Sequence, residues 1–505
     1  MQWMPEPYAR VGVWRGRRVW RSCERAAPTT GGSRMQQLDP RDSVFLYVEN
    51  EVSKQIIVSA YVFAPDGNTG SRSDRNEIGR WIADRVAGID LLRQRLVHVP
   101  FGLDHPYWVD DPDFSLENHL VFHEGSEWDE VCTVLAATLV QPMDGARPLW
   151  ELHVFTDVRG IEGVEGAATV AALKTHHAIA DGMLSAQLGR HLFGSSPATP
   201  DDPHPVAPRE PLPSGFELLV RAVRSAPGAL NRLVSGLPGV RSAQRELALR
   251  CEQGQYTSPV AERPRTVFNR PLGPDRVFGL AVFPLAELRA MKAELGDVTI
   301  NDLALAVIGG AMRKYLDEAG ESPDGSLAAG VPMSTRAARH QVSRNQFVTM
   351  AVDLHTDIVN PVERARAIHR SALDERARKS SPESIRSDEF VQVIPGFAIR
   401  AGLWMLGRLP ARERATVGWG NTLITNVPKG AADLKLCDSS VAVTFSLCAL
   451  VGPSGLGHWV DSVGDILTIN VTADPRQLRD DDRYVELLRG AYAELESAIM
   501  NGAKA

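Results

Sequence analysis

The amino-acid sequence predicts an α/β fold divided between two domains of similar size. The chain has 505 residues, which is more than one ordinary core accommodates and enough for two domains with large buried interiors. Strand-like and helical patterns alternate in both parts of the chain, as is typical of α/β architectures. The stretch Ser196–Ser214 is rich in proline and cannot form a regular element. We therefore expect a first domain over residues 35–195, a linker region over 196–263 and a second domain over 264–505.

The first domain is expected to alternate strands with helices. Gln55–Phe63 reads as a strand, Ser126–Leu139 as an amphipathic helix and Trp150–Asp157 as a second strand. Ala167–His176 is a nearly continuous apolar run that ends in polar residues, which is the pattern of a buried strand delivering side chains to a site. Leucines then recur every four residues, so a helix should begin near Met183.

The linker region continues into a basic helical stretch, Gly215–Arg250, in which six arginines stand among leucines and valines. Two interpretations stay open for this stretch. It is either a helix that lies on a membrane surface or a solvated helix packed on the body of the protein.

The second domain is expected to alternate in the same way. Its predicted helices and strands are listed here in chain order: helix Val298–Leu316, strand Ser326–Pro332, strand Gln346–Leu354, helix Pro361–Ala377, strand Asn421–Val427, strand Ser440–Val451, strand Gly464–Ala473 and helix Arg479–Met500. Two similar α/β halves favour a site at the interface between them.

Composition excludes several classes of protein. A net charge of −7 provides no basic field for nucleic acid, so no nucleic-acid partner is expected. The five cysteines are scattered and never spaced as Cys-x-x-Cys, which fits a reducing compartment and argues against a zinc site. No run reaches the ~18 consecutive apolar residues of a spanning helix. We expect a cytoplasmic protein whose membrane contact, if it has any, is peripheral.

Residues 1–34 differ from the rest of the chain. They hold seven arginines and two acidic residues, and they lack the apolar core of a secretory signal. An Arg-rich, acid-poor leader fits a transit peptide. The composition favours a disordered or wrongly assigned extension, with Met35 as the natural start.

The residues most suggestive of chemistry run from Lys174 to Gly182, in the order Lys-Thr-His-His-Ala-Ile-Ala-Asp-Gly. Neighbouring side chains on a strand point to opposite faces, so only one of His176 and His177 can face a given cleft. A neutral imidazole can take a proton from an alcohol that attacks a thioester. No serine or cysteine stands in a recognisable nucleophile elbow, so direct transfer is favoured over an acyl-enzyme.

Other interpretations of these residues exist. A histidine at a strand end is often a hydrogen-bonded core residue, and Asp181 could simply cap the helix near Met183. Metal binding would need a third ligand, for which the sequence offers no convincing residue, so no metal is expected.

These residues resemble a known active-site motif. His176-His177-x-x-x-Asp181-Gly182 is similar to the motif of the CoA-dependent acyltransferase superfamily, which is shared with non-ribosomal peptide condensation domains. Three further segments resemble the Pro-Leu-Trp, Asn-Asp and Asn-Val-Pro motifs of bacterial wax ester synthase/diacylglycerol acyltransferases: Pro148-Leu149-Trp150, Asn301-Asp302 and Asn426-Val427-Pro428. Asp42, Phe45, Asp111-Pro112-Asp113-Phe114 and His119 fit the same pattern, and the similarity extends from about Leu38 to the C-terminus.

The resemblance implies two chloramphenicol-acetyltransferase-like domains with the active site in a tunnel between them. It implies transfer of a long acyl chain from acyl-CoA, a cosubstrate, to diacylglycerol or a fatty alcohol, with no bound cofactor. His177 would be the general base, Asp181 would be structural and paired with an arginine such as Arg336, and Asn301 would orient substrate or stabilise the oxyanion.

The remaining motif residues have structural alternatives. Thr299-x-x-Asp302 fits a capping box, so Asp302 is expected to be structural. Trp150 would pack in the core or line an acyl tunnel, and Asn426 would contact substrate or serve its own turn. The sequence departs from the family pattern at Lys429-Gly430, where Gly-Pro is usual, and at Val463, where tyrosine is common.

Three competing functions stay open. The first is an acyltransferase of the same superfamily that uses carrier-protein-bound or polyketide substrates. The second is a non-catalytic lipid-binding protein, and the third is an enzyme of cell-envelope ester assembly. Gly215–Arg250 and the apolar, basic stretch Gly396–Arg414 are candidate contacts with a membrane or lipid-droplet surface that supplies the acceptor.

Overall fold

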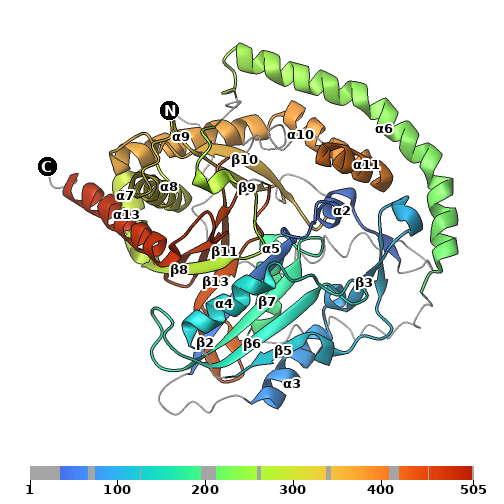
Figure 1. Ribbon diagram of the computed structural model, residues 1–505, viewed down its shortest axis with the longest axis horizontal. Helices are drawn as coiled ribbons and strands as arrows, with labels where there is room; N and C mark the ends of the chain where they lie inside the picture. The colour runs from blue at the N-terminus through green and yellow to red at the C-terminus, as the bar shows by residue number, and fades with distance from the viewer. Residues whose placement is uncertain are drawn as a thin grey trace, which may run out of the picture.

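The computed structural model describes residues 35–65, 74–124, 127–194, 212–258, 263–336, 343–408, 420–452 and 454–502. The predictions for residues 1–34, for residues 195–211 of the Pro-rich stretch and for residues 409–414 lie outside these ranges. Two six-stranded sheets, one from each half of the chain, form the body of the described protein (Figure 1).

The first-half sheet has the strand order β12-β13-β2-β7-β6-β5. Its strands are β2 (Ile56–Pro65), β5 (Leu120–His123), β6 (Trp150–Val158), β7 (Ala168–His176), β12 (Lys435–Leu436) and β13 (Ser439–Leu447). All neighbours are antiparallel except β5 and β6.

Helices cover both faces of this sheet. Successive side chains of a strand point to opposite faces, so β2 contributes side chains to both cores. Tyr61 and Phe63 of β2 pack with α3 (Arg75–Val86) and α5 (Gly182–Phe193). Val58 and Val62 pack on the other face with α4 (Trp128–Thr138). β7 therefore lies buried in the middle of the sheet, as its apolar sequence predicts.

Strands β12 and β13 belong to the second half of the chain but to the sheet of the first half. They lie beyond residue 264 in the chain, yet β13 pairs with β2 through Ser446↔Ser59 and neighbouring positions. The domain division expected at residue 264 therefore does not extend to this pair of strands. Their hydrogen bonds are satisfied by the exposed edge of the first sheet, and the two halves cannot separate without breaking that pairing.

The second-half sheet has the order β10-β9-β11-β14-β15-β8. Its strands are β8 (Val277–Pro284), β9 (Ala328–Ser334), β10 (Phe347–Asp353), β11 (Thr422–Gly430), β14 (Leu456–Val463) and β15 (Ile466–Ala473). Strand β11 pairs in parallel with both β9 and β14, and the other pairs are antiparallel.

Four helices accompany this sheet: α7 (Leu285–Leu295), α8 (Ile300–Glu318), α9 (Pro361–Lys379) and α13 (Asp481–Gly502). The residues of α8 from Asp302 to Met312 are all buried, because the helix lies between the sheet, α9 and α13. A helix that is apolar on every side requires such a position.

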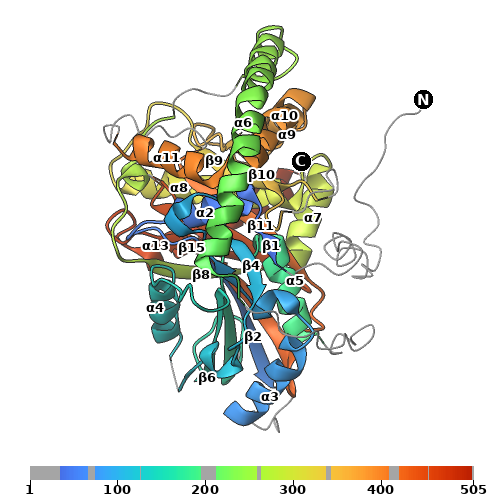
Figure 2. The same cartoon turned by 90° about the vertical axis from the view of Figure 1, so that its right-hand side faces the viewer.

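The remaining elements surround the two sheets. They are α2 (Pro40–Tyr47), α6 (Gly215–Glu252), α10 (Pro382–Glu389), α11 (Gly396–Gly407), five short 3₁₀ helices, and a small sheet of β1 (Gln36–Gln37), β3 (Gln94–Val97) and β4 (Tyr107–Asp110). Helix α6 lies along the outside of the molecule and contacts α10 and η5 (Phe390–Val393) of the second half and η2 (Pro100–Gly102) of the first (Figures 1 and 2).

In the described part of the chain, no single helix is both long and apolar enough to cross a membrane, although two bent pairs, α7 with α8 and residues 382–393 with α11, reach the required length and apolar composition together.

Candidate active site

The junction of β7 and α5 places the two histidines. Backbone bonds hold the end of β7: His176 N donates to Leu149 O at 3.1 Å and His177 N donates to Gln55 O at 2.7 Å. The turn then passes through Gly182, where an added Cβ would lie 2.8 Å from Val427 Cγ2. Glycine is needed here because the second-half strand β11 packs directly on the start of α5.

His177 faces the second half of the molecule. Its Nδ1 lies 2.8 Å from Oδ1 of Asn345, and its ring stacks on Phe45 with centroids 4.0 Å apart and planes 3° from parallel. The ring of Phe347 also lies near, with its centroid 6.0 Å from that of the His177 ring. The side chain is only partly exposed.

The bonds of Asn345 determine which nitrogen of His177 is protonated. Its amide nitrogen donates to Asp42 Oδ1 and to the backbone oxygen of His177, each at 2.8 Å. Its amide oxygen must therefore accept from His177, so Nδ1 carries the hydrogen and Nε2 carries the free electron pair. Nε2 is the atom that can take a proton from a substrate.

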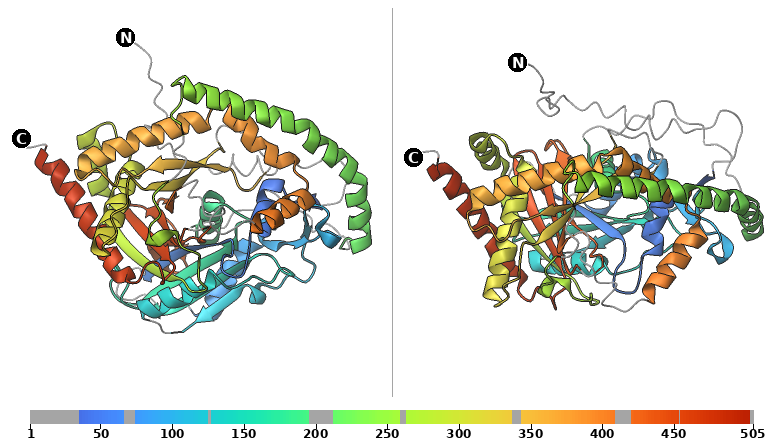
Figure 3. Two further views of the ribbon diagram at one scale, coloured as in Figure 1. Left: turned by 45° about the horizontal axis from the view of Figure 1, so that its top comes forward. Right: turned by 90° about the horizontal axis from the view of Figure 1, so that it is seen from above.

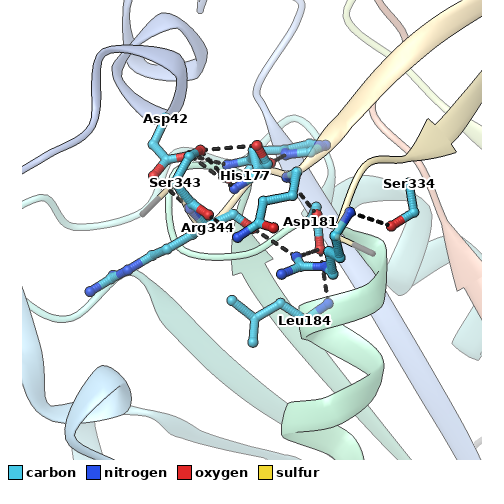
Figure 4. Close-up of polar contacts among 10 residues, drawn as sticks. Asp42, His177, Asp181, Leu184, Ser334, Ser343 and Arg344 are labelled. Atoms are coloured by element: carbon cyan, nitrogen blue, oxygen red, sulfur yellow. Dashed lines mark hydrogen bonds and ion pairs between the residues drawn. The ribbon is translucent and has the colours of Figure 1, made fainter. Parts of the chain in front are cut away.

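Asp42 anchors this arrangement from α2. Its buried carboxylate also accepts from Ser343 Oγ at 2.8 Å and from the backbone N–H groups of Arg344 and Asn345, each at 3.0 Å. Burial raises the pKa of Asp42, and these donated bonds act against that rise. The result is an Asp42–Asn345–His177 chain that joins the two halves (Figure 4).

Burial also controls the charge of His177. It lowers the pKa of the imidazole to about 4, although Asn345 and the nearby carboxylate of Asp181 favour the charged form. The imidazole is therefore neutral at any physiological pH, as a general base must be.

His176 points to the opposite face of β7, as the alternation of the strand requires. Its Nδ1 accepts from Ala178 N at 3.0 Å, and its Nε2 lies 3.3 Å from Glu49 Oε1. Burial acts to raise the pKa of Glu49, but the contact with His176, the hydrogen bond from Gln55 N and the charge of Lys54 together lower that pKa. His176 therefore shapes the turn rather than the cleft.

Asp181 makes structural contacts, as predicted. One oxygen caps α5 by accepting from Leu184 N at 2.9 Å, and it also accepts from Arg336 Nη2 at 2.6 Å. The other oxygen accepts from Gln346 N at 3.1 Å. The predicted pairing with Arg336 is confirmed, and the carboxylate fixes the second-half loop that carries Asn345 (Figure 4).

Asn301 and Asn426 lie together. Asn426 Nδ2 donates to Asn301 Oδ1 at 3.1 Å, so the Asn-Asp and Asn-Val-Pro segments meet. Asp302 closes the predicted capping box with Thr299 at the start of α8, and it also accepts from His369 Nδ1 at 2.7 Å. These bonds fix the helix end that presents Asn301.

The Pro148-Leu149-Trp150 segment lies in the core of the first half. Trp150 is fully buried, donates from Nε1 to Leu92 O at 2.7 Å and stacks on His119 at 4.5 Å. Its position on β6, opposite Thr175 of β7, supports the strand that carries the histidines. Substrate contact by these three residues stays a prediction.

Sequence reasoning did not find Asn345, Ser343 or Glu49. Asn345 is 168 residues from His177 in the chain. The signal available was the polar run Ser343–Gln346 directly before a strand. In the described ranges, no group of three His, Cys, Asp or Glu side chains is placed to hold a metal ion.

Comparison with known proteins identifies the family. A model described as the wax ester synthase/diacylglycerol acyltransferase catalytic domain matches residues 38–304, and a model of the WS/DGAT C-terminal domain matches residues 344–496. The chain belongs to this family. A Mycobacterium tuberculosis (strain CDC 1551 / Oshkosh) protein, provisionally named a diacylglycerol O-acyltransferase, is 27% identical over 475 residues, which cover 92% of this chain and 98% of the relative.

Solved structures agree on the fold. The wax ester synthase/diacylglycerol acyltransferase of Marinobacter aquaeolei VT8 superposes with a TM-score of 0.62 at 20% identity, covering 93% of this chain and 100% of that one. A trichothecene 15-O-acetyltransferase from Fusarium sporotrichioides gives 0.54 at 13% identity, covering 93% and 97%. The predicted two-domain α/β acyltransferase fold is confirmed, and the protein is an acyltransferase of the WS/DGAT family.

Lys429, which departs from the WS/DGAT motif pattern, is buried. Lys429 Nζ lies 3.2 Å from Asp461 Oδ1, with both side chains fully inaccessible, and donates to Ser59 Oγ at 3.1 Å. Burial raises the pKa of Asp461, while Lys429, Ser446 and Asn470 act against that rise. The pair therefore connects β11 and β14 of the second sheet to β2 of the first.

Proposed function

We propose that this WS/DGAT protein transfers a long acyl chain from acyl-CoA to diacylglycerol or a fatty alcohol, with His177 as the general base. The observation that carries the proposal is the bond between His177 Nδ1 and Asn345 Oδ1, which leaves Nε2 free for substrate. The lowered pKa of His177 keeps that atom unprotonated.

The reaction would proceed in two proton transfers. Nε2 of His177 takes the proton of the acceptor hydroxyl as its oxygen attacks the thioester carbon, and the C–O bond forms. The tetrahedral intermediate then breaks its C–S bond, and the CoA thiolate takes the proton back from the imidazolium. An ester and free CoA leave, and His177 is neutral again.

The paired amides are proposed to act on the intermediate. Since Asn426 donates to Asn301 Oδ1, the amide nitrogen of Asn301 keeps both hydrogens for other acceptors. Donors aimed at the developing oxyanion lower the barrier, each typically by about 3 kcal/mol. Asn301 is our candidate for that role, and Asp302 and His369 would position it.

Substrates would reach His177 through a tunnel between the halves, the CoA thioester from one side and the acceptor from the other. The provisional name of the mycobacterial relative supports diacylglycerol as acceptor, and the family description supports a fatty alcohol as well. Acceptors this apolar would be supplied by a lipid surface, so we propose a cytoplasmic protein that works at a membrane or lipid droplet. No bound cofactor is required.

The test is product formation from labelled palmitoyl-CoA with diacylglycerol, hexadecanol or no acceptor. We expect an ester only when an acceptor is present, together with stoichiometric CoA release. Incubation with palmitoyl-CoA alone should leave no acyl group on the protein by intact mass spectrometry.

Other outcomes would identify the competing functions. Activity with acyl-carrier protein in place of acyl-CoA would overturn the donor assignment. Lipid binding without product from either donor would indicate a binding protein instead.

A further inference from the structure

Helix α6 has two apolar faces, and among the described residues only one of them packs against another element. Leu218, Ala222 and Ala243 are buried, because α6 packs there against η2, α10 and η5. At Gly236 an added Cβ would lie 2.8 Å from Phe390 of η5, so the contact is close. This face attaches α6 to both halves of the molecule.

The second face points to solvent. Phe216, Val223, Leu230 and Val234 are exposed by 75%, 60%, 50% and 58% respectively. At about 100° per residue these four positions fall within an arc of about 40°, opposite the buried face. They form an apolar row, which we call the outer stripe, on the helix that Figures 2 and 3 show along the outside of the molecule.

Arginines accompany the outer stripe. At about 100° per residue, Arg241 and Arg245 fall on or within about 20° of the outer stripe and Arg224 lies about 80° to one side of it, whereas Arg221, Arg232 and Arg250 lie farther round the helix. Its acidic residues stand only near its ends, where Glu217 belongs to the N-terminal capping box and Glu246 lies 2.9 Å from Arg250. From Leu218 to Arg245 the helix is therefore purely basic, in a chain whose net charge is −7.

A strained aromatic residue extends the stripe at its N-terminal end. Phe101 is 88% exposed and has a φ of 59°, a conformation that a bulky side chain adopts only at a cost. Its neighbour Pro100 packs at Gly215, the first residue of α6. Arg400 of α11 lies against Gly102, the residue after Phe101, and its guanidinium lies 5.5 Å from the ring centre of Tyr47.

We propose that the outer stripe and Phe101 form a docking surface for an anionic lipid surface. Exposed apolar side chains flanked by arginines match an interface in which rings enter the acyl boundary and guanidinium groups meet phosphates. A second copy of the chain fits less well, because a two-fold interface would bring the arginines of one α6 against those of the other. The inference rests on the proposed function for its purpose, which is delivery of an apolar acceptor.

The test is cosedimentation with vesicles of phosphatidylcholine, with and without phosphatidylglycerol, at low and high salt and without substrates. Wild type should bind the anionic vesicles and be released by salt. The triple variant Val223→Glu, Leu230→Glu, Val234→Glu should lose binding. The triple variant Arg224→Gln, Arg241→Gln, Arg245→Gln should bind about 100-fold more weakly, at about fivefold for each arginine.

Controls separate this proposal from the catalytic one. The pair Val359→Glu and Leu373→Glu changes exposed apolar residues outside α6 and should bind like wild type. CoA release with a short-chain acyl-CoA and a water-soluble alcohol should be unchanged in every stripe variant, which shows that the site is intact. His177→Ala should bind vesicles normally.

Three results would overturn the docking surface. They are unchanged vesicle binding by the outer-stripe variant, equal binding of wild type to neutral and anionic vesicles, and a change of solution mass in the stripe variant with vesicle binding retained. The last result would assign the stripe to a second copy of the chain.

Discussion

His177 depends on Asn345, from the other half of the chain, for its orientation. Asn345 accepts from Nδ1, and Asp42 holds Asn345. The stacked ring of Phe45 excludes water from the imidazole and contributes to the burial that lowers its pKa. The imidazole of His177 is therefore positioned by a hydrogen-bond chain and kept neutral by its surroundings.

The pH dependence of the reaction follows from that pKa. A base works only when unprotonated, and the pKa of His177 is lowered to about 4. Activity should therefore be lost only as pH falls toward about 4, rather than through the value of about 6.5 of an exposed histidine. We expect kcat/KM for CoA release to be flat from about pH 5.5 to 8, and an acid limb near pH 6.5 would contradict this environment for His177.

Asn345→Ala should lower kcat about 100-fold with little change in KM, because the imidazole loses the acceptor that fixes its orientation. Steady-state kinetics measures this split. Asn118→Ala, a change at an exposed asparagine of η3 (Leu116–Asn118), is the matched control and should be silent. A loss confined to KM, or equal losses in both variants, would remove Asn345 from its positioning role.

Part of the site could be predicted from sequence. His177, Asp181 and Gly182 belong to one short segment whose strand–turn–helix geometry follows from local patterns, and the family motif indicated an arginine partner for Asp181. Asn345 could not be found in this way, since its contact depends on the packing of two domains. Trp150 shows the reverse case, because this motif residue is buried in the core of the first half, where substrate contact by it stays a prediction.

At the scale of elements, helix boundaries with clear capping signals were predictable. Thr299-x-x-Asp302 gave the start of α8, and Pro361 gave the first turn of α9. The strands β8 and β14 were not predicted. β8 contains Gly279, and β14 buries the polar residues His458 and Asp461, so neither shows a simple apolar alternation.

The capping box of α8 gives a prediction at this scale. Thr299→Ala removes the hydroxyl that accepts from Asp302 N, so it should lower the free energy of unfolding by about 1 kcal/mol. A fall of about 2–4 °C in the thermal midpoint would report this loss. Thr133→Ala, at an exposed position of α4, is the control and should change the midpoint by less than half as much. Equal falls of the thermal midpoint in the two variants would show that the Thr299 cap stabilises the protein no more than an exposed threonine does.

At the scale of the whole molecule, the two halves are joined by shared structure. β13 of the second half completes the first sheet, and the Lys429–Asp461 pair lies where the two sheets meet. Sequence patterns predicted two α/β halves but not this exchange, because strand order across domains leaves no periodic signal in the chain. The hydrogen-bond chain from Asp42 through Asn345 to His177 also joins the two halves.

The buried pair makes this connection testable. Lys429→Met leaves the Asp461 carboxylate buried without its cation, which should cost about 3–5 kcal/mol of stability in urea unfolding. The double variant Lys429→Met, Asp461→Leu should recover most of that loss, since it removes both charges. Lys292→Met, at an exposed position of α7, is the control and should change the stability little. A small loss of unfolding free energy in Lys429→Met, or a double variant no more stable than the single one, would show that Lys429 and Asp461 do not form a buried ion pair.

The central claim is that His177 is the base of an acyl transfer, and its most direct test is the rate of CoA release by His177→Ala with a saturating acceptor. The variant should retain the fold by circular dichroism and lose at least about 100-fold in kcat, the usual contribution of a general base. Activity within a few-fold of wild type in a folded variant would contradict the account.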